Sequence, residues 1–157
     1  MRRMTKLVPL AAVMLFGAAP LIAQNGHDMA PMHAVDAGAL TWVDLDVPGF
    51  DAGMKLGVIH GDPGVAGPYT IRLSFPPGYR FPAHWHPMAE NLTVLSGTLM
   101  LGMGDTVDDT KLKSYGAGDF LHIPAKHPHF GGARGATVIQ LHGTGPFTIE
   151  LSKPGTM

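Results

Sequence analysis

Apolar and polar side chains alternate in short runs along most of the chain after residue 40. The clearest run is Tyr69–Phe75, in which every odd-numbered residue is apolar and every even-numbered residue is polar. Side chains of a β-strand point alternately to opposite faces, so a period of two predicts a strand with one buried face. Glycine, proline and aspartate end the runs, and no segment after the N-terminal region has the period of an amphipathic helix. The pattern therefore predicts an all-β fold.

The runs divide the chain into about nine short strands, which favours a sandwich or a barrel. The run Thr41–Val47 has the alternation of a half-buried edge strand. The other predicted strands lie within the segments Met54–Gly61, Pro68–Phe75, Gly78–Gly97, Thr98–Gly104, Tyr115–Gly132, Thr137–Gly143 and Pro146–Ser152.

The first 23 residues have the features of a secretory signal peptide. Arg2, Arg3 and Lys6 precede the apolar stretch Leu7–Ala23, which ends in small residues. Proline and glycine interrupt this stretch, and it is short for a bilayer, which argues against a stable membrane anchor. We expect cleavage near Ala23 and a periplasmic or secreted protein. Twin-arginine export stays open as an alternative to ordinary secretion.

The chain is accordingly divided into a signal peptide (residues 1–23), a flexible leader (24–40) and one β-barrel domain (41–157). The leader is rich in glycine, alanine and polar residues and has no sustained periodicity. Four of its side chains form a set that can capture copper, although a spacer without ligands is the simpler interpretation: His27, Met29, Met32 and His33.

Composition narrows the possible functions. The chain has 157 residues, which suits one domain, and it contains no cysteine. Disulfides, thiol catalysis and thiolate metal ligands are therefore excluded. Removal of residues 1–23 takes away three of the eleven basic side chains and none of the twelve acidic ones, so the formal charge changes from −1 to −4. No strongly basic patch is visible, and we expect no nucleic-acid partner.

Two histidines and a glutamate stand out between residues 84 and 90. His84 and His86 would project from the same face of a strand. Glu90 begins a run in which it shares a face with the apolar residues Leu92 and Val94. A carboxylate on a buried face needs a cation, strong hydrogen bonds or a proton. A metal ion held by the two histidines would supply the cation.

This segment resembles the first conserved motif of the cupin superfamily: Gly, five residues, His-x-His, three or four residues, Glu, six residues, Gly. All five fixed positions are matched, by Gly78, His84, His86, Glu90 and Gly97.

The second cupin motif (Gly, five residues, Pro-x-Gly, two residues, His, three residues, Asn) is matched in part, by Gly118, Pro124 and His129. Lys126 stands in place of the second glycine and Ala133 in place of the asparagine. The first departure affects the local turn, because lysine tolerates a positive φ less readily than glycine. The proline-to-histidine spacing selects His129, and His127 is the alternative.

The resemblance covers about Lys55–Leu151 and implies a single-domain cupin barrel with jelly-roll topology. It also implies that His84, His86, Glu90 and His129 bind one divalent transition metal. The ligand types fit iron, manganese, nickel, copper, cobalt or zinc. Four protein ligands leave positions open for water, substrate and dioxygen, which is typical of a catalytic site. By analogy, cupins dimerise through edge strands, for which Thr41–Val47 is the candidate.

The resemblance further implies a function. We expect a metal-dependent dioxygenase, similar to small cupin dioxygenases, that acts on a small organic substrate with an enol, phenol or diketone oxygen. Glu90 would be its general base. A non-redox isomerase or lyase and a non-enzymatic module that binds a metal or small ligand remain alternatives. Cupin lyases for sulfonium substrates often have a tyrosine two residues after the glutamate, and Leu92 argues against that branch.

Other residues are candidates for the surroundings of the metal. The aromatic and thioether side chains closest to the ligands in sequence can form pocket walls: Phe81, Trp85, Met88 and Phe130. Gln140 and His142 share one face of the run Thr137–Gly143, so we expect them at the mouth or in the interior of the barrel. Hydrogen bonding at the barrel rim explains these two polar residues equally well.

Overall fold

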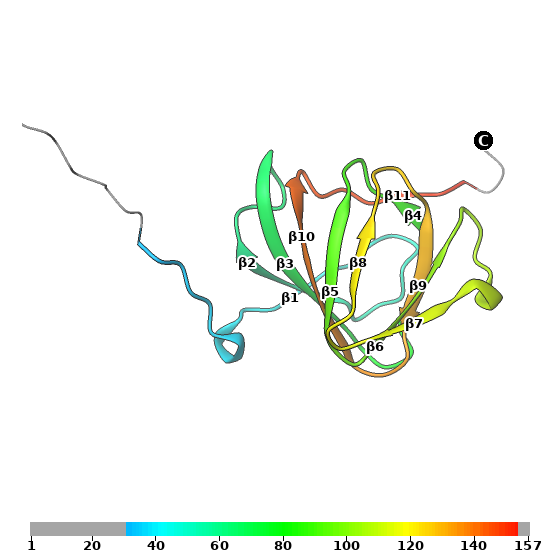
Figure 1. Ribbon diagram of the computed structural model, residues 1–157, viewed down its shortest axis with the longest axis horizontal. Coiled ribbons are helices and arrows are strands. Elements are labelled where there is room, and N and C mark those ends of the chain that lie inside the picture. The colour runs from blue at the N-terminus through cyan, green and yellow to red at the C-terminus, as the bar shows by residue number, and fades with distance from the viewer. Residues whose placement is uncertain (1–30, 154–157) are drawn as a thin grey trace, which may run out of the picture. The chain divides into compact units, whose positions relative to one another are not determined.

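The computed structural model describes residues 31–153 (Figure 1). The predicted signal peptide, its cleavage site and the leader residues His27 and Met29 lie outside this range. The fold below is that of the compact unit that begins at Ala34. No helix within residues 31–153 is long and apolar enough to cross a membrane.

The strands form two antiparallel sheets that face each other (Figure 1). The first sheet has the order β1 (Val43–Asp44), β2 (Lys55–His60), β3 (Gly67–Phe75), β10 (Thr137–Gly145), β5 (Glu90–Ser96) and β8 (Phe120–Ile123). The second has the order β11 (Glu150–Leu151), β4 (Arg80–Trp85), β9 (His129–Ala133), β6 (Thr98–Met103) and β7 (Lys113–Gly116). The helical elements among the described residues are two single 3-10 turns, η1 (Ala37–Ala39) and η2 (Asp109–Lys111). These two sheets confirm the predicted all-β jelly-roll fold.

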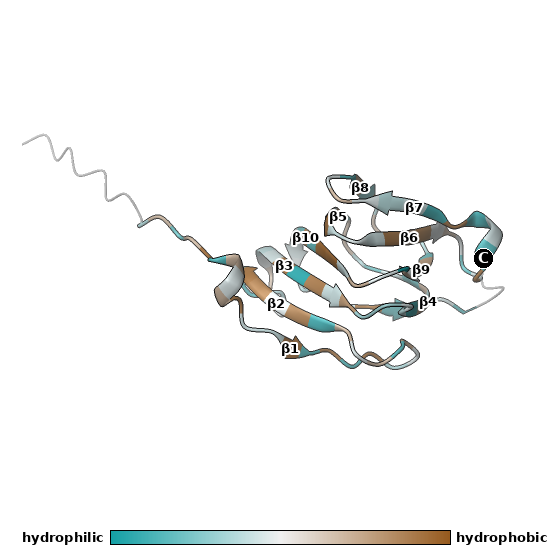
Figure 2. Cartoon of the chain, turned by 90° about the horizontal axis from the view of Figure 1, so that it is seen from below, coloured by the Kyte–Doolittle hydropathy of each residue, from teal (hydrophilic) through white to brown (hydrophobic). Residues whose placement is uncertain are grey.

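The core lies between the sheets. In β3, all odd-numbered residues from Tyr69 to Phe75 are buried, and the polar residues between them are partly exposed. Figure 2 shows hydrophobic and hydrophilic colours alternating along this strand. Leu99 and Leu101 of β6 come from the opposite sheet and belong to the same cluster. Each such side chain stabilises the fold by about 1.5–3 kcal/mol through removal of its apolar surface from water.

Two predicted strands are much shorter in the structure. Of the run Thr41–Val47, only β1 pairs with β2; the Leu45 amide then donates to the carbonyl of Met54, and the chain turns away at Pro48. Of the run Pro146–Ser152, only β11 pairs with β4. The other residues of both runs alternate between apolar and polar as strand residues do. They are not assigned to a strand, because no strand in the described part of the chain pairs with them.

The last residues of the predicted leader lie against the domain. A Cβ atom at Gly57 of β2 would lie 2.7 Å from the side chain of Leu40, so Leu40 packs directly on the glycine backbone. The preceding turn, η1, is capped by the side chain of Asp36, which accepts from the amide of Gly38.

The prediction that Gln140 and His142 line the barrel mouth or interior is wrong. Ile139 and Leu141 of β10 are buried in the core, and the alternate residues face outward. On that outer face, Arg72 Nε donates to Gln140 Oε1 over 3.1 Å. Strand periodicity shows which residues share a face, but the packing of the second sheet determines which face is covered.

Candidate metal centre

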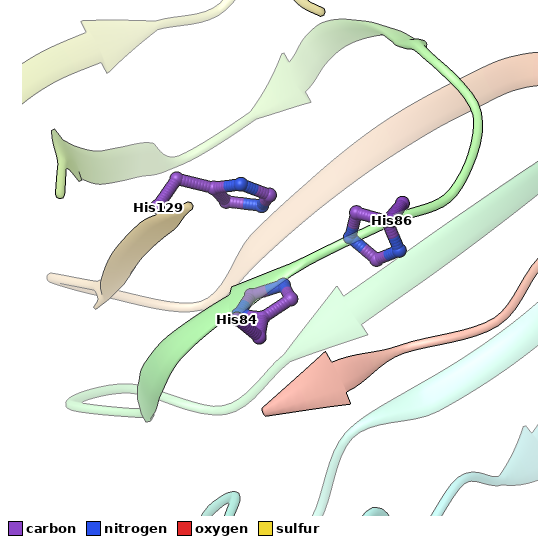
Figure 3. Close-up of side chains that lie close together, drawn as sticks. All are labelled: His84, His86 and His129. Atoms are coloured by element: carbon purple, nitrogen blue, oxygen red, sulfur yellow. The ribbon is translucent and has the colours of Figure 1, made fainter. Parts of the chain in front are cut away.

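The fold brings the four predicted ligands into one cavity between the sheets. His84 belongs to β4, His86 follows directly after it, Glu90 begins β5 and His129 begins β9. All four are at most 5% exposed. The turn between β4 and β5 brings Glu90 next to His86. His129 of β9 supplies the third imidazole, and the three rings lie close together in Figure 3.

The three imidazoles are held with one ring nitrogen turned toward the backbone. Each Nδ1 lies within 3.1 Å of a carbonyl oxygen: that of Pro82 for His84, of Thr148 for His86 and of His127 for His129. A carbonyl oxygen only accepts, so Nδ1 carries the proton and Nε2 keeps its lone pair. One ligand nitrogen from each ring lies within 4.8 Å of the others, so the three histidines can hold one metal ion.

Burial sets the protonation of these rings. It lowers the pKa of His84 to about 3, and the neighbouring imidazoles of His129 and His86 oppose a further positive charge. It lowers the pKa of His86 to about 4, against the stabilising carbonyl of Thr148, and it also lowers the pKa of His129. At neutral pH all three rings are therefore neutral, which is the form that binds a metal.

Burial also raises the pKa of Glu90 to about 8, so without a bound metal the carboxyl keeps its proton at neutral pH. Glu90 Oε2 lies 3.2 Å from His86 Nε2 and 3.6 Å from His129 Nε2. The protonated carboxyl can donate to the Nε2 lone pair of His86. In the metal-free site this proton occupies the side of the imidazole at which a metal would bind.

The second-motif turn keeps its geometry despite the lysine. Lys126 has a φ of 62°, and it is the one non-glycine residue in the described range with a positive φ. Its amide donates to the carbonyl of His86 over 2.8 Å, so the turn fastens the β4–β5 connection. His127 is exposed, whereas His129 is buried in the site, so His129 is the second-motif histidine that faces Glu90.

The cavity has a volume of about 50 Å³ and walls that are almost entirely apolar. Of the predicted wall residues, Phe81 lines it, whereas Met88 is largely exposed and Phe130 packs over Gly102 on the other side of its sheet. Trp85 is half-buried and also lies outside the lining. Other lining residues come from outside the ligand motifs and were not predicted as cavity walls; among them are Phe50, Met54, Phe147 and Ile149.

The donor set fits a transition metal. The three neutral imidazoles point one nitrogen each toward a common point, and the other nitrogen of each ring fixes its orientation. The buried carboxyl of Glu90 lies beside two of these rings, those of His86 and His129. A divalent ion would compensate the charge of the carboxylate and satisfy the three lone pairs together.

Comparison with known proteins assigns the family. A family model described as Cupin domain matches residues 71–142, the segment that contains His84, His86, Glu90 and His129. The chain contains a cupin domain. The comparison with curated proteins gives no match for this cupin.

Solved structures agree with this assignment. The polyketide cyclase RemF from Streptomyces resistomycificus is 18% identical, with a TM-score of 0.66 over 78% of this chain and 87% of that protein. A proposed acetylacetone dioxygenase from Methylibium petroleiphilum is 18% identical, with a TM-score of 0.61 over 80% of this chain and 83% of that one. An RmlC-like cupin from Shewanella frigidimarina is 17% identical, with a TM-score of 0.55 over 73% and 91%. At these identities the likeness concerns the fold alone.

Proposed function

We propose that this cupin is an exported, metal-dependent dioxygenase of small organic substrates that carry an enol, phenol or 1,3-diketone group. The composition of the cavity supports the proposal. Its polar groups are the three imidazoles and the carboxyl of Glu90; among the described residues, no other lining side chain carries a charge, a hydroxyl or an amide. Such a site suits a substrate whose few oxygen atoms face the metal and whose remaining surface is apolar.

In this proposal, one divalent ion is bound by His84, His86, Glu90 and His129. A bound transition metal would supply a Lewis acid for the substrate oxygens and, where it is redox-active, the electrons for reaction with dioxygen. The three imidazoles keep a fixed orientation because their Nδ1 protons are held by backbone carbonyls.

Glu90 is the proposed general base. It is the one acidic side chain that lines the cavity in the described range, and its burial makes the carboxylate a stronger proton acceptor than an exposed one. It would take the proton of an enol, a phenol or an acidic C–H group. The apolar walls, which include Phe81 and Leu92, would exclude water and face the alkyl or aryl parts of the substrate once the cavity opens to admit it.

A non-redox isomerase or lyase is the second candidate. The fold similarity to a polyketide cyclase and the buried, proton-carrying Glu90 favour it. A sugar-like substrate is disfavoured, because the apolar walls offer its hydroxyl groups no hydrogen-bond partners. A metal-binding or ligand-binding module without catalysis is the third candidate.

Export belongs to the proposal because of the basic start and the apolar stretch Leu7–Ala23 of the sequence. We propose the periplasm or the cell exterior as the location.

The test is oxygen uptake by protein reconstituted separately with iron(II), manganese(II), nickel(II), copper(II), cobalt(II) and zinc(II), in the presence of pentane-2,4-dione or catechol. Glu90→Gln removes the base, and His127→Ala is the control because His127 is exposed. Oxygen consumption that is lost in Glu90→Gln and kept in His127→Ala supports the dioxygenase. Turnover of a substrate in the absence of oxygen supports the isomerase or lyase, and stoichiometric metal without any turnover supports the binding module.

A further inference from the structure

One of the three histidines is held differently from the other two. His84 and His129 donate from Nδ1 to carbonyls two residues earlier in the chain, so their orientation is a local property of β4 and β9. His86 donates to the carbonyl of Thr148, which lies 62 positions later, over 2.7 Å. The orientation of His86 therefore depends on a segment near the end of the chain.

That segment is Pro146–Leu151, which we call the C-terminal strap. It begins where β10 ends in the first sheet and finishes as β11, which pairs with β4 of the second sheet. The strap thus crosses from one sheet to the other and ends beside β4, the strand that bears His84 and leads directly into His86. It is fastened at its start, where the Phe147 amide donates to the carbonyl of Pro63 over 2.7 Å.

Phe147 contacts His86 in a second way. The phenyl and imidazole rings are stacked, with 5.0 Å between their centroids and 16° between their planes. Tyr69 packs against the same phenyl ring, with 5.8 Å between the ring centroids. The phenyl ring therefore occupies the space into which the imidazole of His86 would turn, and the Thr148 carbonyl fixes the direction of its Nδ1 proton.

The strap is also a wall between the cavity and the surface. Phe147 and Ile149 line the metal cavity, and both also line a groove on the outside, together with Val47, Pro48 and Pro63. The wall is therefore one layer of side chains thick at this point. Phe50 lies over His84, with 4.9 Å between the ring centroids. The loop that carries Phe50 also contacts the other end of the strap, where Gly49 packs against Leu151.

We propose that Phe147 positions His86 and, with Ile149, forms the entrance through which small apolar substrates pass from the groove to the cavity. This inference rests on the proposed function where it concerns substrate. Movement of these two side chains would open the thin wall, and movement of the strap would also release His86 from Thr148. Access to the cavity and the orientation of one metal ligand would thus depend on the same six residues.

The first test measures the tautomers of the three histidines by nitrogen-15 NMR of the metal-free protein. We expect Phe147→Ala to give a mixture of tautomers for His86 and to leave His84 and His129 with the proton on Nδ1. Thr148→Ala is the matched control, because its side chain is exposed and its carbonyl is kept. Leu101→Ala controls for any loss of cavity wall, since Leu101 lines the cavity from β6. An unchanged His86, or an equal change in all three histidines, would overturn the positioning role.

The second test measures access. Zinc-loaded protein is mixed with an excess of the chelator 4-(2-pyridylazo)resorcinol, and the rate of zinc removal is followed by absorbance. We expect removal about tenfold faster in Phe147→Ala and several-fold faster in Ile149→Ala, with no change in Thr148→Ala. Ile149→Ala keeps the ring stack, so it tests the entrance even where Phe147→Ala folds poorly. Equal rates in Ile149→Ala and the unaltered protein would overturn the entrance.

The third test concerns substrate size. If the entrance limits access, Phe147→Ala should raise kcat/KM for heptane-3,5-dione relative to pentane-2,4-dione by about tenfold. An unchanged ratio would contradict the role in selectivity. The tautomer and zinc measurements require no turnover. If no metal-loaded form of the protein consumes oxygen, the dioxygenase proposal is refuted, and the role of Phe147 is still decided by those two measurements.

Discussion

Glu90 Oε2 lies 3.2 Å from Nε2 of His86, and both side chains are almost fully buried. Because burial lowers the pKa of the imidazole and raises the pKa of the carboxyl, this contact in the metal-free protein is one between two neutral groups and not an ion pair. A metal ion at the same place would replace the carboxyl proton. The protonation of the site is therefore linked to its occupancy.

Metal binding should release close to one proton at pH 7. With a pKa of about 8, Glu90 is protonated in roughly nine-tenths of the metal-free molecules, whereas the three imidazoles have no proton on Nε2 to lose. Calorimetric titration of zinc in buffers with different ionisation enthalpies measures this number. In Glu90→Gln the released proton should disappear, and the affinity for zinc should fall. An unchanged proton count in that variant would show that the proton comes from elsewhere.

The metal-free protein should be most stable near pH 6.5. The folded-state pKa of Glu90 is about 8, above the ordinary value of 4.5 for a glutamate, so its contribution to stability is lost as the pH rises between these values. The folded-state pKa values of His84 and His86 are about 3 and 4, below 6.5, so their contribution is lost as the pH falls below 6.5.

Urea denaturation at pH 5, 6.5 and 8 measures both sides of this maximum. We expect a loss of up to about 2 kcal/mol in the free energy of unfolding between pH 6.5 and 8, from 1.4 kcal/mol per pH unit for one proton. Glu90→Gln should abolish this alkaline loss and keep the acidic one. The same alkaline loss in Glu90→Gln would assign it to another group.

Lys126→Gly should stabilise the protein by about 1 kcal/mol. Lys126 has a φ of 62°, where an L side chain is strained and glycine is not. Lys126→Ala is the control, since it removes the charge and keeps the Cβ atom, and we expect its stability to stay close to that of the unaltered protein. Thermal unfolding of the metal-free forms makes the comparison. Equal stabilisation by both substitutions would point to the charge of Lys126 and not to its backbone.

His129→Ala should reduce the bound metal at least tenfold, and His127→Ala should leave it unchanged. His129 is 3% exposed and faces Glu90, whereas the ring of His127 is exposed and lies 3.3 Å from the carbonyl of Ala125. Elemental analysis of the purified variants, with His86→Ala and Glu90→Ala beside them, gives the occupancy. Loss of metal in His127→Ala with full occupancy in His129→Ala would reverse the assignment.

The mature protein should begin at Gln24. The basic residues before Leu7 and the small residues at the end of the apolar stretch predict cleavage after Ala23. Intact-mass measurement of protein recovered from the periplasm or medium tests this. Full-length protein retained in the membrane fraction would contradict both the cleavage and the predicted location.

The sequence by itself was sufficient to predict the fold class, and it named the four side chains that the fold brings into one cavity. The alternation of apolar and polar residues along Tyr69–Phe75 is a local property of the sequence. Any strand that buries one face in a β-sandwich needs such an alternation. The spacing from His84 to Glu90 is also local: a strand places two imidazoles on one face, and one turn later the carboxyl opposes them. Nearby residues in the chain thus bring three of the four side chains together, although the orientation of the His86 ring also depends on Thr148.

Only the tertiary structure decided what surrounds them. The periodicity of β10 is the same whether Gln140 or Ile139 points inward, and the second sheet buries Ile139 because it covers that face alone. Phe50 and Phe147 reach the cavity from a loop and from the strap, which have no pattern that predicts their neighbours. The bond from His86 to Thr148 joins residues 62 positions apart, and such contacts depend on how the whole chain packs, which local preferences do not specify.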